Sequence, residues 1–324
     1  MPATKPPASR RRPRRARRTR QAVLVLVCAT LIEACSSGQP SAAAAPDGLL
    51  ALVADPTGTT LVGWDASGHE GVPIALPKGD TVWVAGGLAH VLAVTLADGT
   101  TATSDPVRLG TRLGWRPVKA KTPSGDPAKG PDFFATWDPD GGRYATLAGD
   151  VQSGEGVRVA LIDPSAGTVV EMPLDRPVVA APPAWIDNDR LVIVTGDAGE
   201  PMATIVDAAS GELSDGPTGA RLLATSANGR RIATMAGQGA PVVIHETSAW
   251  LGDDGSSIAS IEPAGDATTA IAFALDATGD RLVVAWAARN GSVSLAIHDA
   301  RAGWRRVAQP KIGKARGAVV AWLR

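Results

Sequence analysis

The chain has 324 residues, with 32 basic and 32 acidic side chains, a formal net charge of zero and two cysteines. The basic residues crowd the N-terminus: residues 1–34 hold nine Lys or Arg and one Glu, which leaves 23 basic and 31 acidic residues beyond them, a net charge of −8. A mildly acidic body argues against nucleic acid as a bulk partner. Two cysteines are too few for a disulfide framework.

The N-terminus has the three parts of a secretory signal. Residues 10–20 contain eight arginines, residues 22–32 are an apolar run of eleven, and small residues follow. The run is too short to span a bilayer, which needs about 20 residues. We therefore predict that residues 1–34 are a signal peptide. Two alternatives stay open, namely a simple secretory cleavage within residues 41–45 and an arginine-rich nucleic-acid arm.

Cys35 is the predicted site of lipid attachment. The sequence Ile32-Glu33-Ala34-Cys35 resembles a lipoprotein box, with Glu33 departing from the pattern. The resemblance implies that Cys35 becomes the diacylated first residue of the mature chain, anchored to the outer face of the cytoplasmic membrane. Cys28 would be removed, which leaves no thiol for a disulfide or a metal site. Residues 35–47 are small and polar, and we predict a flexible tether with a reach of roughly 20 Å.

The next segment contains short strand patterns. Residues 49–53, 61–64 and 72–76 are three predicted strands with no opening strand before them. Residues 80–121 form the least regular unit, with predicted strands at 81–84 and 90–96 and a turn at Asp98-Gly99.

The clearest unit runs from residue 134 to residue 174. Two of its turns, at 138–142 and 163–167, contain an Asp that bonds to the backbone, a Pro that presets φ and a Gly that accepts a positive φ. Apolar runs lie before, between and after these turns. The order strand, turn, strand, loop, strand, turn, strand indicates a four-stranded antiparallel meander.

Weaker copies of this unit recur with a period of about 40–50 residues, as in propeller blades. The first hairpin recurs at 185–194, 223–235 and 273–284, and the second at 205–211, 297–303 and, in degenerate form, 244–249. Residues 191–194 and 282–286 are apolar without alternation, which implies cover on both faces. Residues 318–322 resemble an opening strand that would pair with the first three strands. We predict an all-β propeller of six four-stranded blades, with seven as the alternative, in one domain over residues 48–324.

The sequence FATWDPDGGR at 134–143, with IDPSAG at 162–167, resembles the WD40-like repeat of TolB-type bacterial β-propellers. Only residues 134–167 fit well, and the other copies keep the spacing but lose part of the turn. The resemblance implies a propeller fold and a tendency to bind other proteins. Such repeats occur in proteins of many functions, so the resemblance assigns no catalytic residue.

The histidines indicate no catalytic or metal site. His245 and His298 occupy one repeat position, where other copies have Ile162 and Val206, and we predict structural roles for both. Asp138-Pro-Asp-Gly141 resembles the start of a calcium loop, but Gly149 stands where a bidentate Glu is required. We therefore expect no catalytic residue, no metal and no cofactor.

Two stretches are basic within the acidic body. Residues 108–132 hold six basic and two acidic side chains, among them Arg112 and Arg116 on either side of Trp115. Residues 301–316 hold six basic and no acidic side chains, among them Arg305 and Arg306. These stretches are either solvated loops with an outer strand, or a basic surface for an acidic partner or for anionic lipid heads near the anchor.

The leading functional hypothesis is a monomeric, lipid-anchored, non-enzymatic propeller that binds an envelope protein or a cell-wall ligand. The second is a hydrolase or lyase that uses the central channel, which needs convergent His, carboxylate and Arg groups. The third is a sugar-binding propeller, which needs exposed aromatic rings. Trp115, Trp250 and Trp304 are the candidates, because no predicted core strand contains them.

Overall fold

The computed structural model describes residues 48–55, 58–65, 67–68, 71–74, 81–84, 91–95, 100–104, 115–117, 135–150, 155–163, 165–179, 181–196, 199–252 and 254–323. The chain divides into Met1–Ala43 and Ala44–Arg324, and every described residue belongs to the second unit. The predicted signal peptide, Cys35 and Arg112 lie outside the described residues. Trp115 and Arg116 are described as strand backbone only.

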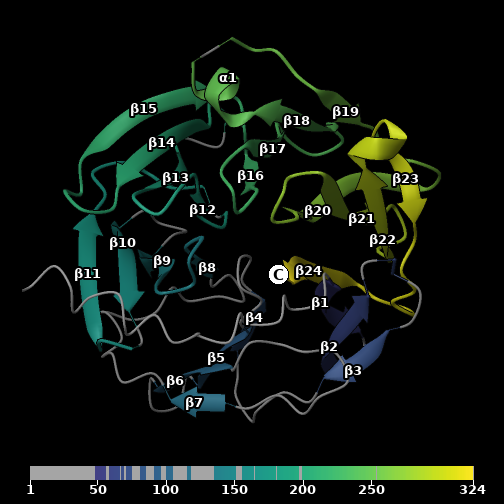
Figure 1. Ribbon diagram of the computed structural model, residues 1–324, viewed down its shortest axis with the longest axis horizontal. Helices are drawn as coiled ribbons and strands as arrows, with labels where there is room; N and C mark the ends of the chain where they lie inside the picture. Colours follow the sequence, from purple (N-terminus) through teal and green to yellow (C-terminus); the bar gives the residue numbers. More distant parts are fainter. Residues whose placement is uncertain are drawn as a thin grey trace, which may run out of the picture. The chain divides into compact units, whose positions relative to one another are not determined.

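The described residues form six four-stranded antiparallel sheets (Figure 1). From inner to outer strand these are β24 (Gly317–Leu323), β1 (Gly48–Asp55), β2 (Gly58–Asp65) and β3 (Val72–Ile74); β4 (Thr81–Val84), β5 (Val91–Thr95), β6 (Thr100–Ser104) and β7 (Trp115–Pro117); β8 (Ala135–Trp137), β9 (Tyr144–Asp150), β10 (Glu155–Asp163) and β11 (Thr168–Pro173); β12 (Ala184–Trp185), β13 (Arg190–Thr195), β14 (Met202–Asp207) and β15 (Leu213–Thr218); β16 (Leu222–Thr225), β17 (Arg231–Met235), β18 (Val242–Glu246) and β19 (Ala259–Ile261); and β20 (Ala267–Leu275), β21 (Arg281–Ala288), β22 (Val293–Asp299) and β23 (Arg305–Ala308).

Helical structure is minor in the described part of the chain. It comprises α1 (Thr247–Leu251) and the 3-10 turn η1 (Ala300–Ala302). None of the described helices is long and apolar enough to cross a membrane. Helix α1 replaces the turn of the degenerate second hairpin at residues 244–249, which lacks the glycine found in the other copies.

The sheets pack face to face around an axis, as the blades of a β-propeller (Figure 1). Four buried apolar clusters join five blades in succession: β8–β11 to β12–β15, then to β16–β19, then to β20–β23, and last to the sheet of β24, β1, β2 and β3. The described side chains thus define five packed blades, and not the six or seven that the repeat count predicted. The difference lies in sheet β4–β7, whose strand backbone is described but whose packing is not.

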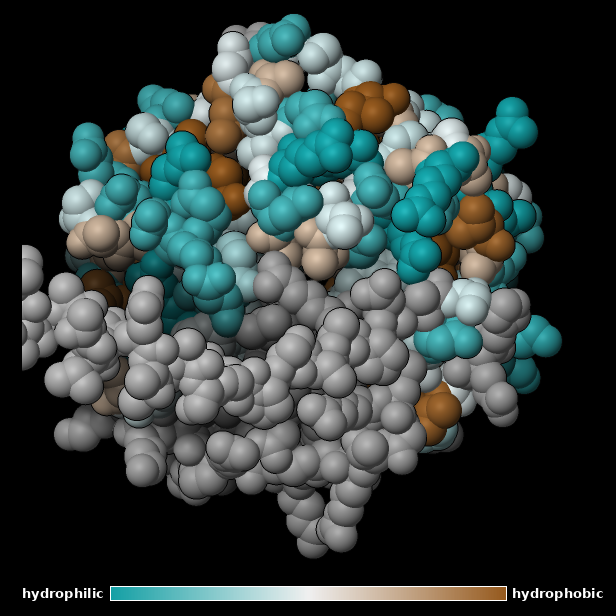
Figure 2. Space-filling model, viewed as in Figure 1, coloured by the Kyte–Doolittle hydropathy of each residue, from teal (hydrophilic) through white to brown (hydrophobic). Residues whose placement is uncertain are grey.

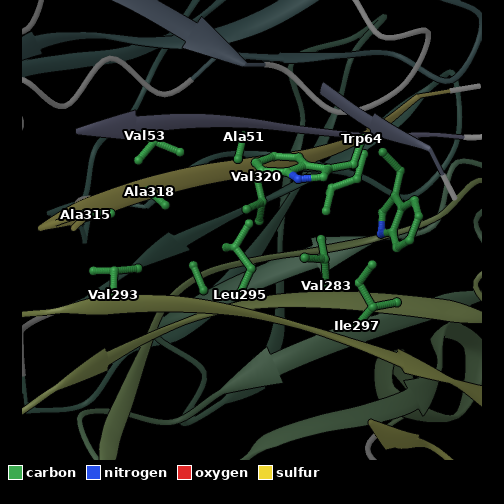
Figure 3. Close-up of a cluster of buried hydrophobic side chains, with 13 residues drawn as sticks. Ala51, Val53, Trp64, Val283, Val293, Leu295, Ile297, Ala315, Ala318 and Val320 are labelled. Carbon is green, nitrogen blue, oxygen red and sulfur yellow. The ribbon is translucent and has the colours of Figure 1, made fainter. Parts of the chain in front are cut away.

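The ring is closed by the two ends of the domain, as predicted. Strand β24 pairs with β1 along its whole length, from Gly48 opposite Leu323 to Ala54 opposite Gly317. We call the sheet of β24, β1, β2 and β3 the closing blade. Its side chains pack on β21 and β22 through Trp64, Val283 and Leu295 (Figure 3). Pairing the first and last strands removes two sheet edges.

The middle strands are buried on both faces. In β13 every residue after Arg190 is buried, and all five residues of β17 are buried. An uninterrupted apolar run is the pattern expected of a strand covered on both faces, which confirms the interpretation of residues 191–194 and 282–286. Neither face of these middle strands is exposed to solvent, so the sheets depend on the neighbouring blades to bury them.

The repeat also sets hydrogen bonds between blades. Trp185 donates from Nε1 to the carbonyl of Thr136 in the preceding blade, at 2.9 Å. Trp322 makes the equivalent bond to Ala274, also at 2.9 Å. Gly229 shows how closely the turns approach, because its φ is +65° and an added Cβ would lie 2.2 Å from the carbonyl oxygen of Ile186. A side chain at this position would push two blades apart.

We predict that Ala321→Asp destabilises the domain by an amount on the order of 4 kcal/mol, because Ala321 is fully buried opposite Leu50 and a carboxylate there has no partner. The matched control is Val319→Asp on the same strand, where the side chain is 44 % exposed. Urea unfolding followed by tryptophan fluorescence measures both. Equal losses at the two positions would contradict the closure of the ring by β24.

Candidate functional site

The innermost strands carry no acid–base chemistry. Strands β4, β8, β12, β16, β20 and β24 contain no Asp, Glu, His, Lys, Arg, Cys or Tyr within their described bounds. Two apolar residues on these strands, Ile271 and Val319, are among the most exposed large hydrophobic side chains. General acid–base catalysis in a channel needs titratable groups that converge on the substrate. The innermost strands do not supply such titratable groups within their described bounds.

His245 and His298 are structural, as their shared repeat position predicted. Each is 8 % exposed. His245 bonds through Nδ1 to the Ser256 carbonyl at 2.8 Å and through Nε2 to the Thr234 hydroxyl at 3.3 Å. Among the described residues no group of three His, Cys, Asp or Glu side chains could hold a metal ion.

His298 lacks the second bond. Its Nδ1 bonds to the Trp304 carbonyl at 3.1 Å, but Nε2 is buried without a partner. Val284 stands in β21 where Thr234 stands in β17, so no hydroxyl is present for this nitrogen. Burial, more than any other cause, holds the pKa of His298 below its ordinary value, and the charge of Arg306 acts in the same direction. The bond to Trp304 opposes the shift in pKa.

Trp250 and Trp304 are not exposed aromatic rings. Trp250 lies on α1 and fills the space between blades β12–β15 and β16–β19, with 6 % exposure. Trp304 is 8 % exposed and packs under the Arg231 guanidinium, 5.3 Å from its ring centre. No predicted core strand contains them because Trp250 lies on α1 and Trp304 lies in the turn before β23, yet both segments fold back onto the blades. Neither ring can serve as a sugar-stacking platform.

Two turn arginines hold neighbouring blades together, a role the sequence did not reveal. Arg143 bonds to the Asn188 carbonyl and lies over the ring of Trp185 in the next blade. Arg231 donates to the Gly279 carbonyl and to Asp280 in the next blade, each at 2.8 Å. Both arginines follow the first turn of a blade. This shared position in the repeat is the feature of the sequence that could have indicated their role. We infer that these arginines stabilise the ring.

The C-terminal basic stretch follows β23, the outer strand of blade β20–β23, and continues through the connection to β24. We call it the basic strip; its members are Arg301, Arg305, Arg306, Lys311, Lys314 and Arg316, and all six are exposed. Arg305 and Arg306 begin β23, which pairs only with β22 and is therefore an edge strand. Figure 2 shows hydrophilic side chains projecting from the right-hand side of the molecule, over this blade. The sequence predicted this charge, and the structure places it on a solvent-facing edge.

A surface hollow of about 280 Å³ lies at one end of the same blade, where β20 begins and β21 ends. It is lined by residues 265–268 and 288–290. The lining includes Asp266 and Arg289, which are both exposed, while the Asn290 carboxamide oxygen is occupied by the Ser292 amide and hydroxyl. The sequence did not indicate this hollow, because it arises from two loops that are separated by the length of a hairpin.

Comparisons with known proteins agree with this architecture. No protein-family model matches the sequence, and no curated protein matches it. Among solved structures, TolB from Acinetobacter baumannii superposes with a TM-score of 0.55 at 14 % identity, over 85 % of this chain and 66 % of that one. The chain has a β-propeller fold that is similar to that of TolB.

A structure of a nidogen/laminin complex has the same TM-score of 0.55 at 10 % identity, and the match covers 85 % of this chain and 98 % of that one. The structure of a puromycin hydrolase mutant complexed with PGG has a TM-score of 0.48 at 18 % identity, over 82 % of this chain and 52 % of that one. At 10–14 % identity, the similarity to TolB and to the nidogen/laminin structure establishes the fold alone. The function therefore has to be inferred from the residues of the candidate sites and not from the fold.

We predict that the free energy of unfolding falls as the pH is lowered from about 7 to about 5, in part through His298. In the unfolded chain His298 takes up a proton near its ordinary pKa of 6.5, while the folded pKa is lower. The unfolded state therefore binds more protons in this window, and the stability present above pH 6.5 is lost on acidification. Urea unfolding at a series of pH values, for the wild type and for His298→Leu, should show a shallower dependence in the variant.

Val284→Thr is the rescue variant. The new hydroxyl would face His298 as Thr234 faces His245, and it would accept the Nε2 proton of the imidazolium. It should therefore reduce the loss of stability on acidification, whatever its effect at neutral pH. Val283→Thr, on the neighbouring and equally buried residue, is the control and should leave the pH dependence unchanged. A Val284→Thr curve parallel to that of the wild type would show that the buried Nε2 does not set the dependence.

Proposed function

We propose that the protein is a non-enzymatic binding scaffold, exported and anchored by a lipid on Cys35 outside the cytoplasmic membrane. The observation that carries the proposal is that the described inner strands contain no titratable side chain, which favours binding over channel catalysis. The fold supports this use, because a ring of packed blades holds its loops and edges on a rigid frame. In this proposal sheet β4–β7 is the sixth blade, and its inner strand β4 contacts β24 and β1 of the closing blade.

The anchor is part of the proposal and comes from the sequence. A basic region, a short apolar run and the box ending in Cys35 support lipid attachment and export. Strand β1 begins at Gly48, so the proposed tether from Cys35 spans about a dozen residues. Such a tether would keep the ring within roughly 20 Å of the bilayer.

Two surfaces of blade β20–β23 are candidates for partner contact. One is the basic strip, which suits an anionic partner, and the other is the hollow beside Asp266 and Arg289. The predicted basic residues Arg112 and Arg116, with Trp115, would extend the partner surface from sheet β4–β7. The partner itself is proposed to be an envelope protein or a cell-wall ligand, bound by a monomeric ring.

We predict that Cys35→Ser abolishes membrane attachment of the full chain expressed in its own host. Wild-type protein should enter the detergent phase on Triton X-114 partition and incorporate labelled palmitate, whereas the variant should do neither. Cys28→Ser is the matched control, because Cys28 would be removed with the signal peptide. Equal labelling of wild type and Cys35→Ser would contradict the anchor.

The binding proposal is tested by affinity capture of the full chain from its own envelope, after cross-linking. The wild type is compared with Arg305→Glu/Arg306→Glu and with Asp266→Lys/Arg289→Glu, each variant serving as the control for the other surface. We expect at least one co-purified component to be lost in one variant and retained in the other. Capture of the same components by both variants and by an unrelated lipoprotein would count against a binding scaffold.

A further inference from the structure

The side chains of the basic strip are exposed and carry charge of one sign. Residues 301–316 hold six cations and no acidic side chain, and none of the six forms an ion pair with a described residue. Two described carboxylates close to the strip already have partners. Asp299 accepts the Arg301 amide at 2.7 Å and faces Arg281 at 3.4 Å, and Asp280 binds Arg231 at 2.8 Å. The six cations are therefore exposed and unpaired by any described carboxylate.

The backbone beneath the strip is unsuited to adding another strand. The pairing of β22 with β23 shifts between Ile297 and His298, so Val307 is an extra bulged residue that is 52 % exposed. Trp304, just before β23, has a φ of +61° and forces a sharp entry into the strand. Bulges and charged side chains protect sheet edges from pairing with extended chains. An acidic peptide that binds as a fifth strand is therefore disfavoured on this edge.

The strip lies next to the blade from which the tether leaves. The closing blade packs on β21 and β22 through a shared apolar cluster (Figure 3). Its loop at Gly68 approaches β22 so closely that an added Cβ would lie 3.0 Å from Ile297 Cδ1. Gly48 begins β1 at the end of the ring where β23 also begins. The last residues of the inner strands β24 and β20 lie side by side, because Trp322 bonds to the Ala274 carbonyl. Strand β1 begins where β24 ends, and β23 begins at the end of its blade where β20 ends.

These observations identify one partner chemistry. This surface combines positive charge, a β-bulge and an exposed valine. Such a surface is better suited to the mobile phosphate groups of a lipid bilayer than to a protein partner of fixed shape. The tether leaves from the neighbouring blade and would hold the strip near the bilayer at high local concentration. We propose that the basic strip binds anionic lipid headgroups, so that the propeller rests on the membrane by the outer edge of blade β20–β23. This placement rests on the proposed anchor, but the affinity of the strip for lipid does not.

The experiment uses the Ala44–Arg324 unit, which contains every described strand and buried cluster and lacks Cys35. Its sedimentation is measured with vesicles of phosphatidylcholine alone and of phosphatidylcholine with an equal amount of phosphatidylglycerol. We expect binding to the anionic vesicles only, and weaker binding as NaCl is raised from about 0.05 M to about 0.5 M. Because each cation near an anionic surface contributes roughly a factor of five, Arg305→Glu/Arg306→Glu should lose roughly 30-fold or more in partitioning.

The matched control is Arg221→Glu, which is compared with the single variant Arg305→Glu because both make the same change in charge. Arg221 is an exposed arginine outside the strip that forms no ion pair with a described residue. The Arg221→Glu variant should bind the anionic vesicles as the wild type does. Arg305→Gln/Arg306→Gln gives an intermediate loss if charge is the cause, and circular dichroism confirms that each variant is folded. The proposal is overturned if the wild-type unit binds neutral and anionic vesicles equally, or if Arg305→Glu and Arg221→Glu lose the same amount.

The outcome separates this inference from the anchor. Loss of palmitate labelling at Cys35 with vesicle binding intact would remove the proposed anchor and keep the lipid-binding strip. Intact vesicle binding by Arg305→Glu/Arg306→Glu, with loss of a captured envelope protein, would overturn the lipid assignment in favour of a protein partner.

Discussion

Packing of one blade on the next is the interaction on which the rest of this structure depends. Strands such as β13 and β17 are apolar on both sides, and neither face can be left in water. The faces of each sheet are therefore shielded from water by the neighbouring blades. The ring is complete only when the last strand, β24, pairs with the first, β1. The low aromatic content is consistent with this design, because tryptophans such as Trp64 and Trp185 fill the spaces between blades.

The turns at one end of the ring add directional contacts to this apolar packing. Arg143 and Arg231 reach from one blade to the backbone of the next, and Trp185 and Trp322 do so from equivalent positions. In other repeats the same turn positions use local bonds, as in the ion pair of Arg190 with Asp187 at 2.7 Å. The repeat therefore keeps a residue type while its bonds adapt to the neighbour that each blade meets.

We propose that this protein binds its partner through the edges and loops of the ring. The inner strands present Ala, Thr, Val and Leu where a channel enzyme would need titratable groups, so chemistry at the axis has no support from these strands. The basic strip lies instead on the outer strand of blade β20–β23 and on the connection that follows it. This edge belongs to the blade that packs against the first strand of the domain, which connects the surface to the proposed tether.

The sequence by itself determined the strand order, the repeat, the closure by the C-terminal strand and the structural character of His245 and His298. These follow from local turn chemistry and from apolar periodicity, which short segments carry without help from the rest of the chain. Tertiary structure alone decided that Trp250 and Trp304 are buried, that Nε2 of His298 has no partner, that Asp266 and Arg289 share a hollow, and which sheets pack as blades. The physical reason is that burial and partner choice depend on which neighbouring blade covers a residue, and that neighbour lies about 50 residues away in the chain.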